Sequence, residues 1–386
     1  MTEFRFIHTS DLHLGRRFGN LPDPVRGRLV EARHQIIGRL AQAARDHGTS
    51  HILVAGDIFE TETPTDQVWR QALAALAADA TVHWWMIPGN HDSLAAESLW
   101  QRFRGHAADN IHLLDAEVPV EIAPGVVLLP CPAPQRYPGR DLTRWMAGCA
   151  TDPNGFRIGL AHGAVQAFGE DGARSGDIIP PDRAASARLD YLALGDWHGR
   201  LKVGERTWYS GTPERDSFGT PERDSFGMDG RGSCLAVTLP AVQAAPRVET
   251  VWTGAYSWSD SALPLLGGHD AADALLALLP ADGSDRRNHL IKVRAQGRAT
   301  LAQQAGLRQA AAAVAPEFCH FELDVSALQT EFEAADLDVI DRNGALRLAA
   351  DSLSLAAQDA GRTDDARRIS TAALNRLYGY LREDRP

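Results

Sequence analysis

Short apolar runs alternate with amphipathic stretches across residues 4–200, and almost every run ends in a glycine, an acid, an asparagine or a histidine. The runs have the length and residue types of β-strands, and the stretches between them have the period of helices. Strands that alternate with helices are typical of an α/β fold. The runs are FRFIHTS, HILVAG, VHWWMIPG, VVLLPCP, FRIGLAHG and YLALGDWHG.

The stretch between the first two runs shows the helical period most clearly. Within residues 24–46, apolar side chains recur every three or four positions, as a helix packed on a sheet requires. In open α/β sheets, ligands bind in the crevice beyond the carboxyl ends of the strands. We therefore expect the polar residues that follow the apolar runs to converge on one site. The apolar positions of the helix are Val25, Leu29, Ala32, Ile36, Leu40 and Ala43.

Beyond residue 200, the runs TWYSGT and GSCLAVTLP predict two more strands, and a tandem duplication lies between them. The octapeptide TPERDSFG occurs at 212–219 and again at 220–227. Two such copies are too few for a repeat fold, and loops tolerate insertions because the entropy of closing them grows slowly with length. We therefore expect a lengthened surface loop, with a functional flap as the alternative.

The remaining part of the chain predicts a smaller unit and a helical end. In residues 289–325, LIKVRA and HFELDV flank an Ala-rich helical stretch, which is a β-α-β pattern. The Gly-, Asp- and Ala-rich residues 259–288 predict a hinge or linker. Two amphipathic helices, 344–360 and 364–382, would form either a cap on their own domain or a docking surface for a partner. The expected domains are 1–258, 259–333 and 334–386.

Composition and charge narrow the class of protein. Of the 386 residues, 44% are hydrophobic, and no apolar run approaches the roughly 20 residues that span a bilayer. The start MTEFRFIHTSDLH lacks the features of a signal peptide, so we expect a cytoplasmic protein without a membrane segment. The net charge of −11 argues against a stand-alone nucleic-acid coat, but a groove that meets nucleic acid locally, or through a partner, stays open. The four cysteines form no Cys-x-x-Cys pair, which argues against a disulfide framework or a thiolate zinc site.

Five short polar motifs follow the predicted strands. Their carboxylate, imidazole and carboxamide groups are ligands suited to Mn, Fe or Zn. Any one motif alone is weak evidence, because polar side chains ordinarily collect in surface connections. All five, in order and each after a strand, indicate a metal centre. They are Asp11-x-His13, Gly56-Asp57, Gly89-Asn90-His91-Asp92, Ala161-His162-Gly163 and Gly195-Asp196-Trp197-His198.

With these motifs, residues 5–215 resemble the calcineurin-like metallophosphoesterase superfamily, whose pattern is D-x-H, G-D, G-N-H-[DE], H and G-H-x-H. HTSDLHLGR, AGDIFE and YSGTPE are most similar to the branch of SbcD-type DNA exonuclease subunits. The resemblance implies an α/β fold: a metallophosphoesterase β-sandwich flanked by helices in 1–258, a small β-α-β capping domain in 259–333, and C-terminal helices in 334–386.

The resemblance also implies a centre of two divalent cations, with Mn²⁺ expected first and Mg²⁺ or Fe²⁺ as alternatives. Two cations roughly 3.5–4 Å apart stabilise the attacking and leaving oxygens of an in-line displacement and supply hydroxide at neutral pH. The ligands carried over are Asp11, His13, Asp57 and His198 for the first cation, and the bridging Asp57 with Asn90, His162 and Asp196 for the second.

Two further residues of the third motif would serve catalysis. In the family, the imidazole at the position of His91 contacts the phosphate and protonates the leaving oxygen, which suits a histidine because its pKa lies near neutrality. Asp92 would orient His91 or brace the loop, and the alternative is an N-cap for the helix expected in SLAAESLWQRF.

The chain departs from the family pattern at two positions. Asp196 stands where the family has histidine; it can still coordinate, and its charge favours harder ions such as Mn²⁺ or Mg²⁺, while a role beside the ligands is the alternative. Glu60 stands where SbcD-type enzymes commonly have histidine, so it would either support the imidazolium of His91 or face solvent. Arg16 and Arg17 would steer phosphates or form a solvated loop.

The resemblance favours an enzyme: a metal-dependent exo- or endonuclease acting on DNA in double-strand-break repair. Its partner would be an SbcC-type coiled-coil ABC ATPase that supplies the basic surface, and a homodimer stays open. The second hypothesis is a metallophosphoesterase that acts on nucleotides or other small phosphates. The third is a catalytically silent scaffold, because metal sites tolerate ligand loss poorly.

Overall fold

The computed structural model describes residues 3–165, 178–218, 230–265, 270–280, 285–331 and 344–383. The chain divides into two compact units, Met1–Trp258 and Ser259–Pro386, which are described separately. The second copy of the duplicated octapeptide, 220–227, lies outside the described residues. None of the helices described is long and apolar enough to cross a membrane.

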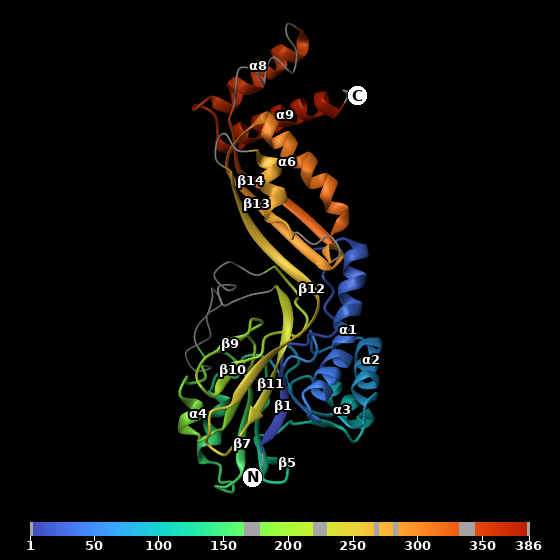
Figure 1. Ribbon diagram of the computed structural model, residues 1–386, viewed down its shortest axis with the longest axis vertical. Helices are drawn as coiled ribbons and strands as arrows, with labels where there is room; N and C mark the ends of the chain where they lie inside the picture. Colours follow the sequence, from blue (N-terminus) through green and yellow to red (C-terminus); the bar gives the residue numbers. More distant parts are fainter. Residues whose placement is uncertain are drawn as a thin grey trace. The chain divides into compact units, whose positions relative to one another are not determined.

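The first unit contains two β-sheets with helices on their outer faces (Figure 1). Within this unit, the strands of the first sheet have the order β12-β11-β1-β2-β3-β4; β1 to β4 are parallel, and β11 is antiparallel to both of its neighbours. The strands are β1 (Phe4–Thr9), β2 (His51–Ala55), β3 (His83–Ile87), β4 (Ile111–Leu113), β11 (Arg231–Leu239) and β12 (Arg247–Leu265).

The second sheet has the order β5-β6-β7-β8-β10-β9, in which β6, β7, β8 and β10 are parallel. These two sheets flanked by helices confirm the predicted α/β class. The strands are β5 (Val120–Ala123), β6 (Val126–Cys131), β7 (Phe156–His162), β8 (Tyr191–Gly195), β9 (Leu201–Lys202) and β10 (Thr207–Tyr209).

The helices of the first unit follow from their apolar faces and end signals. In α1 (Asp23–Asp46), proline lies in the first turn and Asp23 complements the helix dipole. The helix ends at Asp46; His47 is its C-cap, and Gly48 follows with a φ of +64°. Together α1, α2 and α3 pack on the first sheet, while η1 and α4 pack on the second. The others are α2 (Asp66–Ala77), α3 (Glu97–His106), η1 (Leu142–Gly148) and α4 (Arg183–Ser186).

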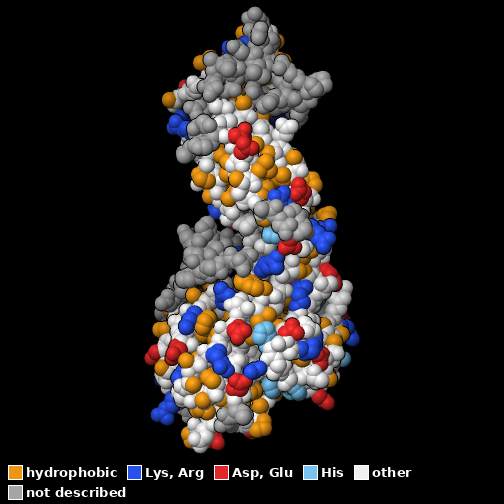
Figure 2. All heavy atoms as spheres, in the orientation of Figure 1, with side chains coloured by type: hydrophobic (Ala, Val, Ile, Leu, Met, Phe, Trp, Pro, Cys, Tyr) orange, Lys and Arg blue, Asp and Glu red, His pale blue; other side chains and the backbone are white. Residues whose placement is uncertain are grey.

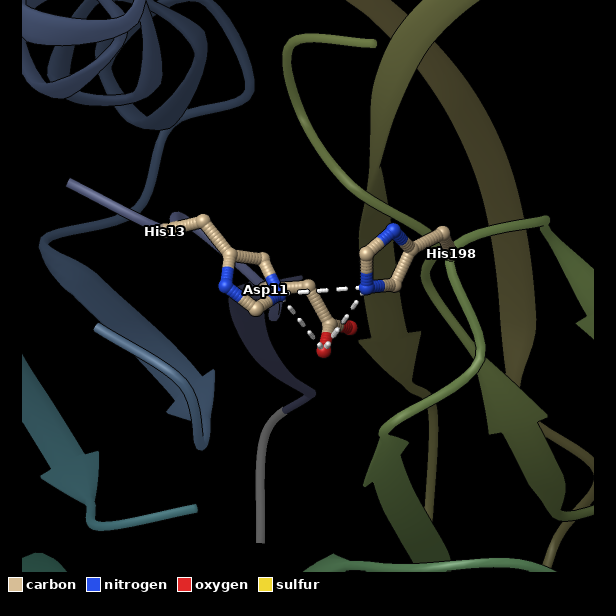
Figure 3. Close-up of side chains that lie close together, drawn as sticks. All are labelled: Asp11, His13 and His198. Carbon is tan, nitrogen blue, oxygen red and sulfur yellow. Dashed lines mark hydrogen bonds and ion pairs between the residues drawn. The ribbon is translucent and has the colours of Figure 1, made fainter. Parts of the chain in front are cut away.

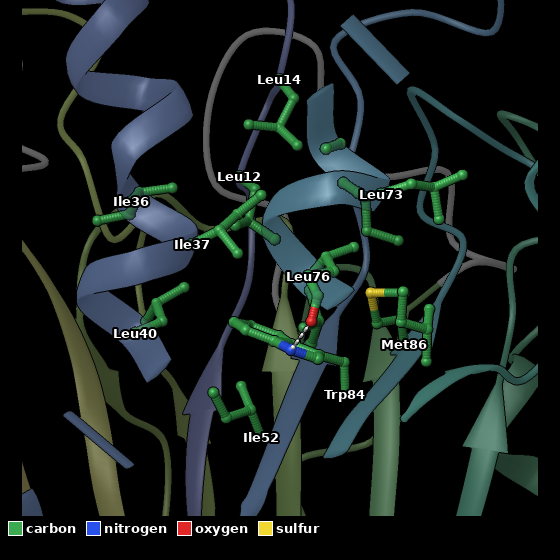
Figure 4. Close-up of a cluster of buried hydrophobic side chains, with 14 of the residues drawn as sticks. Leu12, Leu14, Ile36, Ile37, Leu40, Ile52, Leu73, Leu76, Trp84 and Met86 are labelled. Atoms are coloured by element: carbon green, nitrogen blue, oxygen red, sulfur yellow. Dashed lines mark hydrogen bonds between the residues drawn. The ribbon is translucent and has the colours of Figure 1, made fainter. Parts of the chain in front are cut away.

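One buried cluster joins α1 and α2 to the first sheet (Figure 4). Trp84 of β3 lies at its base, 1% exposed, and its indole nitrogen donates to the carbonyl of Leu76 at 3.1 Å. Each fully buried leucine or isoleucine contributes roughly 1.5–3 kcal/mol relative to an exposed one. This packing fixes the helices on the sheet and so holds the loops at the strand ends in place. The labelled residues are Leu12, Leu14, Ile36, Ile37, Leu40, Ile52, Leu73, Leu76, Trp84 and Met86.

The second unit contains the predicted β-α-β pattern, in which β13 and β14 are parallel and α6 connects them. Its core also includes α5 and the end of β12. The two predicted C-terminal helices are confirmed as α8 and α9. The elements are α5 (Ala271–Leu278), η2 (Arg286–Asn288), β13 (His289–Thr300), α6 (Leu301–Val314), η3 (Ala315–Glu317), β14 (His320–Glu331), α8 (Ala345–Gln358) and α9 (Asp364–Glu383).

The predicted linker at 259–288 is wrong. Strand β12 continues to Leu265, and α5 occupies Ala271–Leu278. The side chain of Asp270 caps α5 by accepting from the backbone of Ala272, and Leu275 is fully buried. Composition suggested a flexible segment, but the apolar spacing within ALLALL is that of a packed helix.

Candidate metal centre

Four of the predicted ligands have an unusual backbone conformation. The φ angles of Asp11, His13, Asp57 and Asp196 are +54°, +44°, +53° and +97°. Non-glycine residues rarely adopt positive φ, and such positions cluster at functional sites. The chain therefore turns sharply at the ends of β1, β2 and β8, and these turns direct the side chains toward one centre.

The first group of candidate ligands is Asp11, His13 and His198 (Figure 3). Their ligand atoms all lie within 4.8 Å of one another. The Nε2 atoms of His13 and His198 are 3.1 Å apart, and each lies 4.0 Å from Oδ1 of Asp11. Each ring therefore directs its Nε2 atom toward a common point.

The second group is Asp11, Asp57 and His162, again within 4.8 Å. Nε2 of His162 lies 3.5 Å from Oδ2 of Asp57 and 3.0 Å from Oδ1 of Asn90. The same Asp57 oxygen is 3.6 Å from Nε2 of His13, so Asp57 reaches both groups. This is the position that the resemblance assigns to a bridging ligand.

Asp196 lies at the edge of the second group. Its Oδ1 is 3.8 Å from Nε2 of His162, and its backbone N–H donates to both oxygens of Asp11 at 3.2 and 3.3 Å. Its side chain is 34% exposed, whereas that of Asp11 is fully buried. The structure therefore brings Asp196 to the centre, on the side that is open to solvent.

The electrostatics of the centre are dominated by burial and by mutual pairing. Burial opposes the imidazolium form of His162, but the charge of Asp57 outweighs it and raises the pKa of His162 well above its ordinary value. Burial also opposes ionisation of Asp57, yet the charge of His162 lowers the pKa of Asp57 well below its usual range. Burial raises the pKa of Asp196 against the opposing charge of His162. The imidazolium of His162 and the carboxylate of Asp57 therefore stabilise each other, because burial disfavours either charge alone.

These residues fit a pair of divalent cations. Three carboxylates, from Asp11, Asp57 and Asp196, lie within one small region, and buried like charges require a compensating positive charge. The donors are oxygen and imidazole nitrogen, which suit Mn, Fe or Zn. With a cation bound, the cation would replace the protons that the pairing now requires.

His91 lies beside this group. Its ring is perpendicular to that of His13, with the ring centres 4.9 Å apart. Its Nδ1 lies 3.0 Å from the backbone oxygen of Glu60, and its backbone N–H donates to Oδ1 of Asp57 at 2.9 Å. An Nδ1–H bond to a carbonyl fixes the ring and leaves Nε2 to exchange a proton.

Asp92 is fully buried and braces two loops. It accepts hydrogen bonds from the backbone of Gly89 at 2.7 Å and of Phe59 at 2.9 Å. The alternative role as a helix N-cap is wrong, because α3 begins at Glu97 and its N-cap is Ala96. Its bonds join the turn before His91 to the loop after β2, so Asp92 holds the loop rather than the imidazole.

The carboxylate of Glu60 lies close to both His13 and His91, because one ligand atom from each of the three residues lies within 4.8 Å of the others. Of the two alternatives expected for Glu60, this agrees with the one that places it near His91, and its shortest side-chain contact is with His13. Its Oε2 lies 3.0 Å from Nδ1 of His13, and Arg16 donates to the same carboxylate at 3.3 and 3.4 Å. The reason is local: the backbone of Glu60 donates to Leu14, which aligns the two loops and places the carboxylate beside His13. Arg16 is therefore part of the site, whereas Arg17 is exposed.

The first copy of the duplication contributes residues that the sequence analysis missed. Glu214 and Asp216 are buried, so a surface loop is the wrong description of this copy. Oδ2 of Asp216 lies 3.3 Å from Nδ1 of His198, and Glu214 pairs with Arg39 at 2.5 Å. Partners of opposite charge offset the cost of burying both carboxylates. The sequence could not predict these contacts, because the positions of Glu214 and Asp216 within the repeated octapeptide match no recognised motif.

The span that carries the ligands matches a known family. The calcineurin-like phosphoesterase family model matches residues 4–200, from β1 to the last ligand motif. The chain belongs to the calcineurin-like phosphoesterase family, which implies a metal-dependent phosphoester hydrolase.

Individual relatives share only part of the chain. The uncharacterized metallophosphoesterase YhaO of Bacillus subtilis (strain 168) is 28% identical over 211 residues, 52% of this chain and 50% of that protein. The SbcD component of the nuclease SbcCD of Escherichia coli (strain K12) is 30% identical over 158 residues, 37% of this chain and 36% of that component. The chain thus aligns with half or less of these relatives' lengths. Among solved structures, purple acid phosphatase PPD1 from yellow lupin seeds is similar, with a TM-score of 0.44 at 13% identity over 65% of this chain and 52% of that one.

Proposed function

We propose that this protein is a two-metal phosphodiesterase that cleaves DNA. The observation that carries the proposal is the pair of overlapping ligand groups, with Asp57 within reach of both His13 and His162. The similarity to the SbcD component of the nuclease SbcCD supports DNA as the substrate. The proposed ligands are Asp11, His13, Asp57 and His198 for one cation, and Asp57, Asn90, His162 and Asp196 for the other.

When bound, two divalent cations supply charge stabilisation for an in-line displacement at phosphorus and a nucleophilic hydroxide at neutral pH. We propose Mn²⁺ as the native ion, because the donors include three carboxylates, which favour harder ions. The residues of the chain then orient the substrate and move protons. Asp57 and Asp11 hold the two halves of the site together, and Asp92 fixes the turn that carries Asn90 and His91.

His91 is proposed as the general acid. Its Nδ1 is held by the backbone oxygen of Glu60, so its Nε2 can donate a proton to the leaving oxygen as the phosphodiester bond breaks. Asp92 acts on this step only as a positioning residue, because both of its hydrogen bonds go to backbone N–H groups of neighbouring loops.

The charge of the chain bears on how DNA would be held. The net charge is −11, and Figure 2 shows Lys and Arg side chains interspersed with Asp and Glu on the face of the first unit that it presents. DNA binding relies on neutralising phosphates with basic side chains. A partner that supplies a basic surface, such as an SbcC-type coiled-coil ABC ATPase, is therefore part of the proposal.

The C-terminal helices offer a surface for such a partner. Leu348 and Leu355 of α8 are each 73% exposed and lie seven residues apart, which places them on one helix face. Ile369 of α9 is also exposed. Apolar residues at this spacing are used in helix-in-groove recognition. A homodimer is the alternative use of the same residues, and the proposed cellular location is the cytoplasm.

The test is Mn²⁺-dependent degradation of end-labelled double- and single-stranded DNA by the full chain, with a small chromogenic phosphodiester alongside. Cleavage of DNA that is lost in His91→Ala supports the proposal. Turnover of the small diester alone would support the second candidate, a phosphoesterase for small phosphates. No turnover of either substrate, even with the ATPase partner added, together with no Mn²⁺ bound at millimolar concentration, would overturn the enzyme assignment and favour a scaffold.

A further inference from the structure

The two histidines of the first ligand group share a second feature. While their Nε2 atoms converge, each Nδ1 faces a carboxylate: that of His13 lies 3.0 Å from Oε2 of Glu60, and that of His198 lies 3.3 Å from Oδ2 of Asp216. The Nδ1 atom of His13 is buried and makes no hydrogen bond within the described residues, so its contact with Glu60 is an ion-pair distance of 3.0 Å. Each imidazole therefore lies between the candidate metal centre, on its Nε2 side, and a carboxylate, on its Nδ1 side.

One guanidinium connects the two acids. Nη1 of Arg16 lies 3.3 Å from Oε1 of Glu60, and Nε of Arg16 lies 3.4 Å from Oδ2 of Asp216. The loop can place Arg16 there because Gly15 before it has a φ of +94°, a conformation that other residues rarely adopt. Arg16 follows directly on the Asp11-x-His13 motif, so the ligand loop also carries the connecting residue.

Asp216 is anchored from a second side. Its side chain is 1% exposed, and Nη2 of the buried Arg33 lies 4.0 Å from its Oδ2. Arg33 in turn donates to the backbone oxygens of Leu12 and Glu214, each at 2.6 Å. A carboxylate buried to this extent requires such partners, since an unpaired buried charge is strongly destabilising.

We propose that Arg16, Glu60 and Asp216 form one positioning unit that fixes His13 and His198 with Nδ1 protonated and Nε2 free to bind the first cation. A carboxylate that accepts from Nδ1–H sets the tautomer and the ring orientation, and it makes the other nitrogen a better ligand. The proposal rests on the proposed metal centre. It assigns to Arg16 and Glu60 a role different from phosphate steering or support of His91.

The geometry favours arginine in this role. The planar guanidinium presents Nε and Nη1 in fixed, different directions, so it can pair with two carboxylates at once. A lysine would keep the charge but offers a single ammonium on a flexible stem. Arg16 also balances part of the negative charge that Glu60 and Asp216 add next to the ligands.

The test is Mn²⁺ binding to the full chain, measured by calorimetry and by electron paramagnetic resonance, in the variants Glu60→Gln, Asp216→Asn and Arg16→Lys. We expect each variant to weaken one of two Mn²⁺ sites about 10–100-fold while the other keeps its affinity. The resonance signal of a coupled Mn²⁺ pair should give way to that of a single Mn²⁺ at intermediate concentrations.

Two variants in matched sequence contexts serve as controls. Arg17→Lys changes the neighbouring, exposed arginine, and Asp224→Asn makes the same change as Asp216→Asn in the second copy of the octapeptide. Both should bind Mn²⁺ as the unchanged protein does. Circular dichroism and thermal melting without metal establish that each variant is folded.

The outcomes separate this proposal from the function above. Two unchanged Mn²⁺ sites in folded Glu60→Gln and Asp216→Asn would overturn the positioning unit while leaving the metal centre intact. A loss in Asp224→Asn in place of Asp216→Asn would overturn the assignment of Asp216. If the unchanged chain cleaves no DNA but the three variants bind Mn²⁺ more weakly, the result would support the positioning unit and count against the nuclease. No Mn²⁺ binding by the unchanged chain would overturn both.

Discussion

The Nε2 atoms of His13 and His198 lie 3.1 Å apart although 185 positions separate the two residues in the chain. One follows β1 of the first sheet and the other follows β8 of the second, so the centre forms where the carboxyl ends of two sheets meet. Ligand sites at this edge of parallel sheets are a general property of α/β folds.

Replacing the shared carboxylate should affect both cations. Asp57→Asn keeps the size of the side chain but removes the charge that pairs with His162. We expect Mn²⁺ content to fall from two per chain to fewer than one, and phosphodiester turnover to fall at least ~100-fold. Metal analysis after gel filtration and a kinetic assay measure both, and a variant that retains two tightly bound ions would contradict the bridging role.

Removing the proposed acid should spare the metals. His91→Asn should lower kcat by about 10²–10⁴-fold, since general acid catalysis contributes that much, while Mn²⁺ affinity stays within a few-fold. A substrate with a more acidic leaving group needs less protonation and should recover part of the loss. Equal losses for good and poor leaving groups would instead assign His91 to phosphate binding.

Gly56 is required by a close approach. It has a φ of +87°, and a Cβ there would lie 2.3 Å from Nδ1 of His162, which bonds to the carbonyl of Ala55. Gly56→Ala should therefore lower the free energy of unfolding by about 1–3 kcal/mol and weaken the second cation site.

Gly27 offers the matched control for Gly56. It lies within α1, and a Cβ there meets no atom within 4 Å. Gly27→Ala should raise the free energy of unfolding by roughly 0.5–1 kcal/mol, because alanine is the better helix former. Urea denaturation of both variants measures the difference, and equal stabilities would contradict the argument from Gly56.

Asp196 should set the preference among metals. Asp196→His provides the histidine of the family pattern and exchanges an oxygen donor for nitrogen. Affinity for Zn²⁺ relative to Mn²⁺ should rise about tenfold or more, since imidazole is the softer ligand. Competition between the two ions in calorimetry measures the ratio, and an unchanged ratio would place Asp196 outside the ligand set.

His8 should contribute to acid sensitivity. Its ring nitrogens lie 3.0 Å from the hydroxyl of Tyr191 and 3.2 Å from the carbonyl of Leu194, and burial lowers its pKa to about 3. The folded pKa is below the unfolded value of about 6.5. As the pH falls from there toward 3, the unfolded chain binds a proton that the folded chain does not, which lowers stability by about 1.4 kcal/mol per pH unit.

The variant His8→Gln isolates this effect because glutamine can bond to the same groups without titrating. Urea denaturation at several pH values between 4 and 7 should give a shallower loss of stability for the variant. The same slope in both proteins would show that His8 does not carry the effect.

The sequence predicted the parts of the fold that repeat a pattern. Buried parallel strands are continuous apolar runs, so β2 and β3 were found with their ends, and the ligands follow directly from those ends. Strand β12 was missed because few of its residues are buried and its sequence shows neither a continuous apolar run nor a regular alternation. No spacing rule predicts that Glu60 faces His13, since that contact depends on how two loops align in three dimensions.

The positions of the candidate ligands along the chain determine when the metal centre can be completed during synthesis. Candidate ligands come from five strand ends distributed over both sheets, and the last, His198, follows only after most of the first unit. A growing chain would therefore lack a complete pair of the proposed cation sites until synthesis has passed His198. Each of the two proposed cation sites takes ligands from both sheets, so uptake of either ion would report that both sheets have formed.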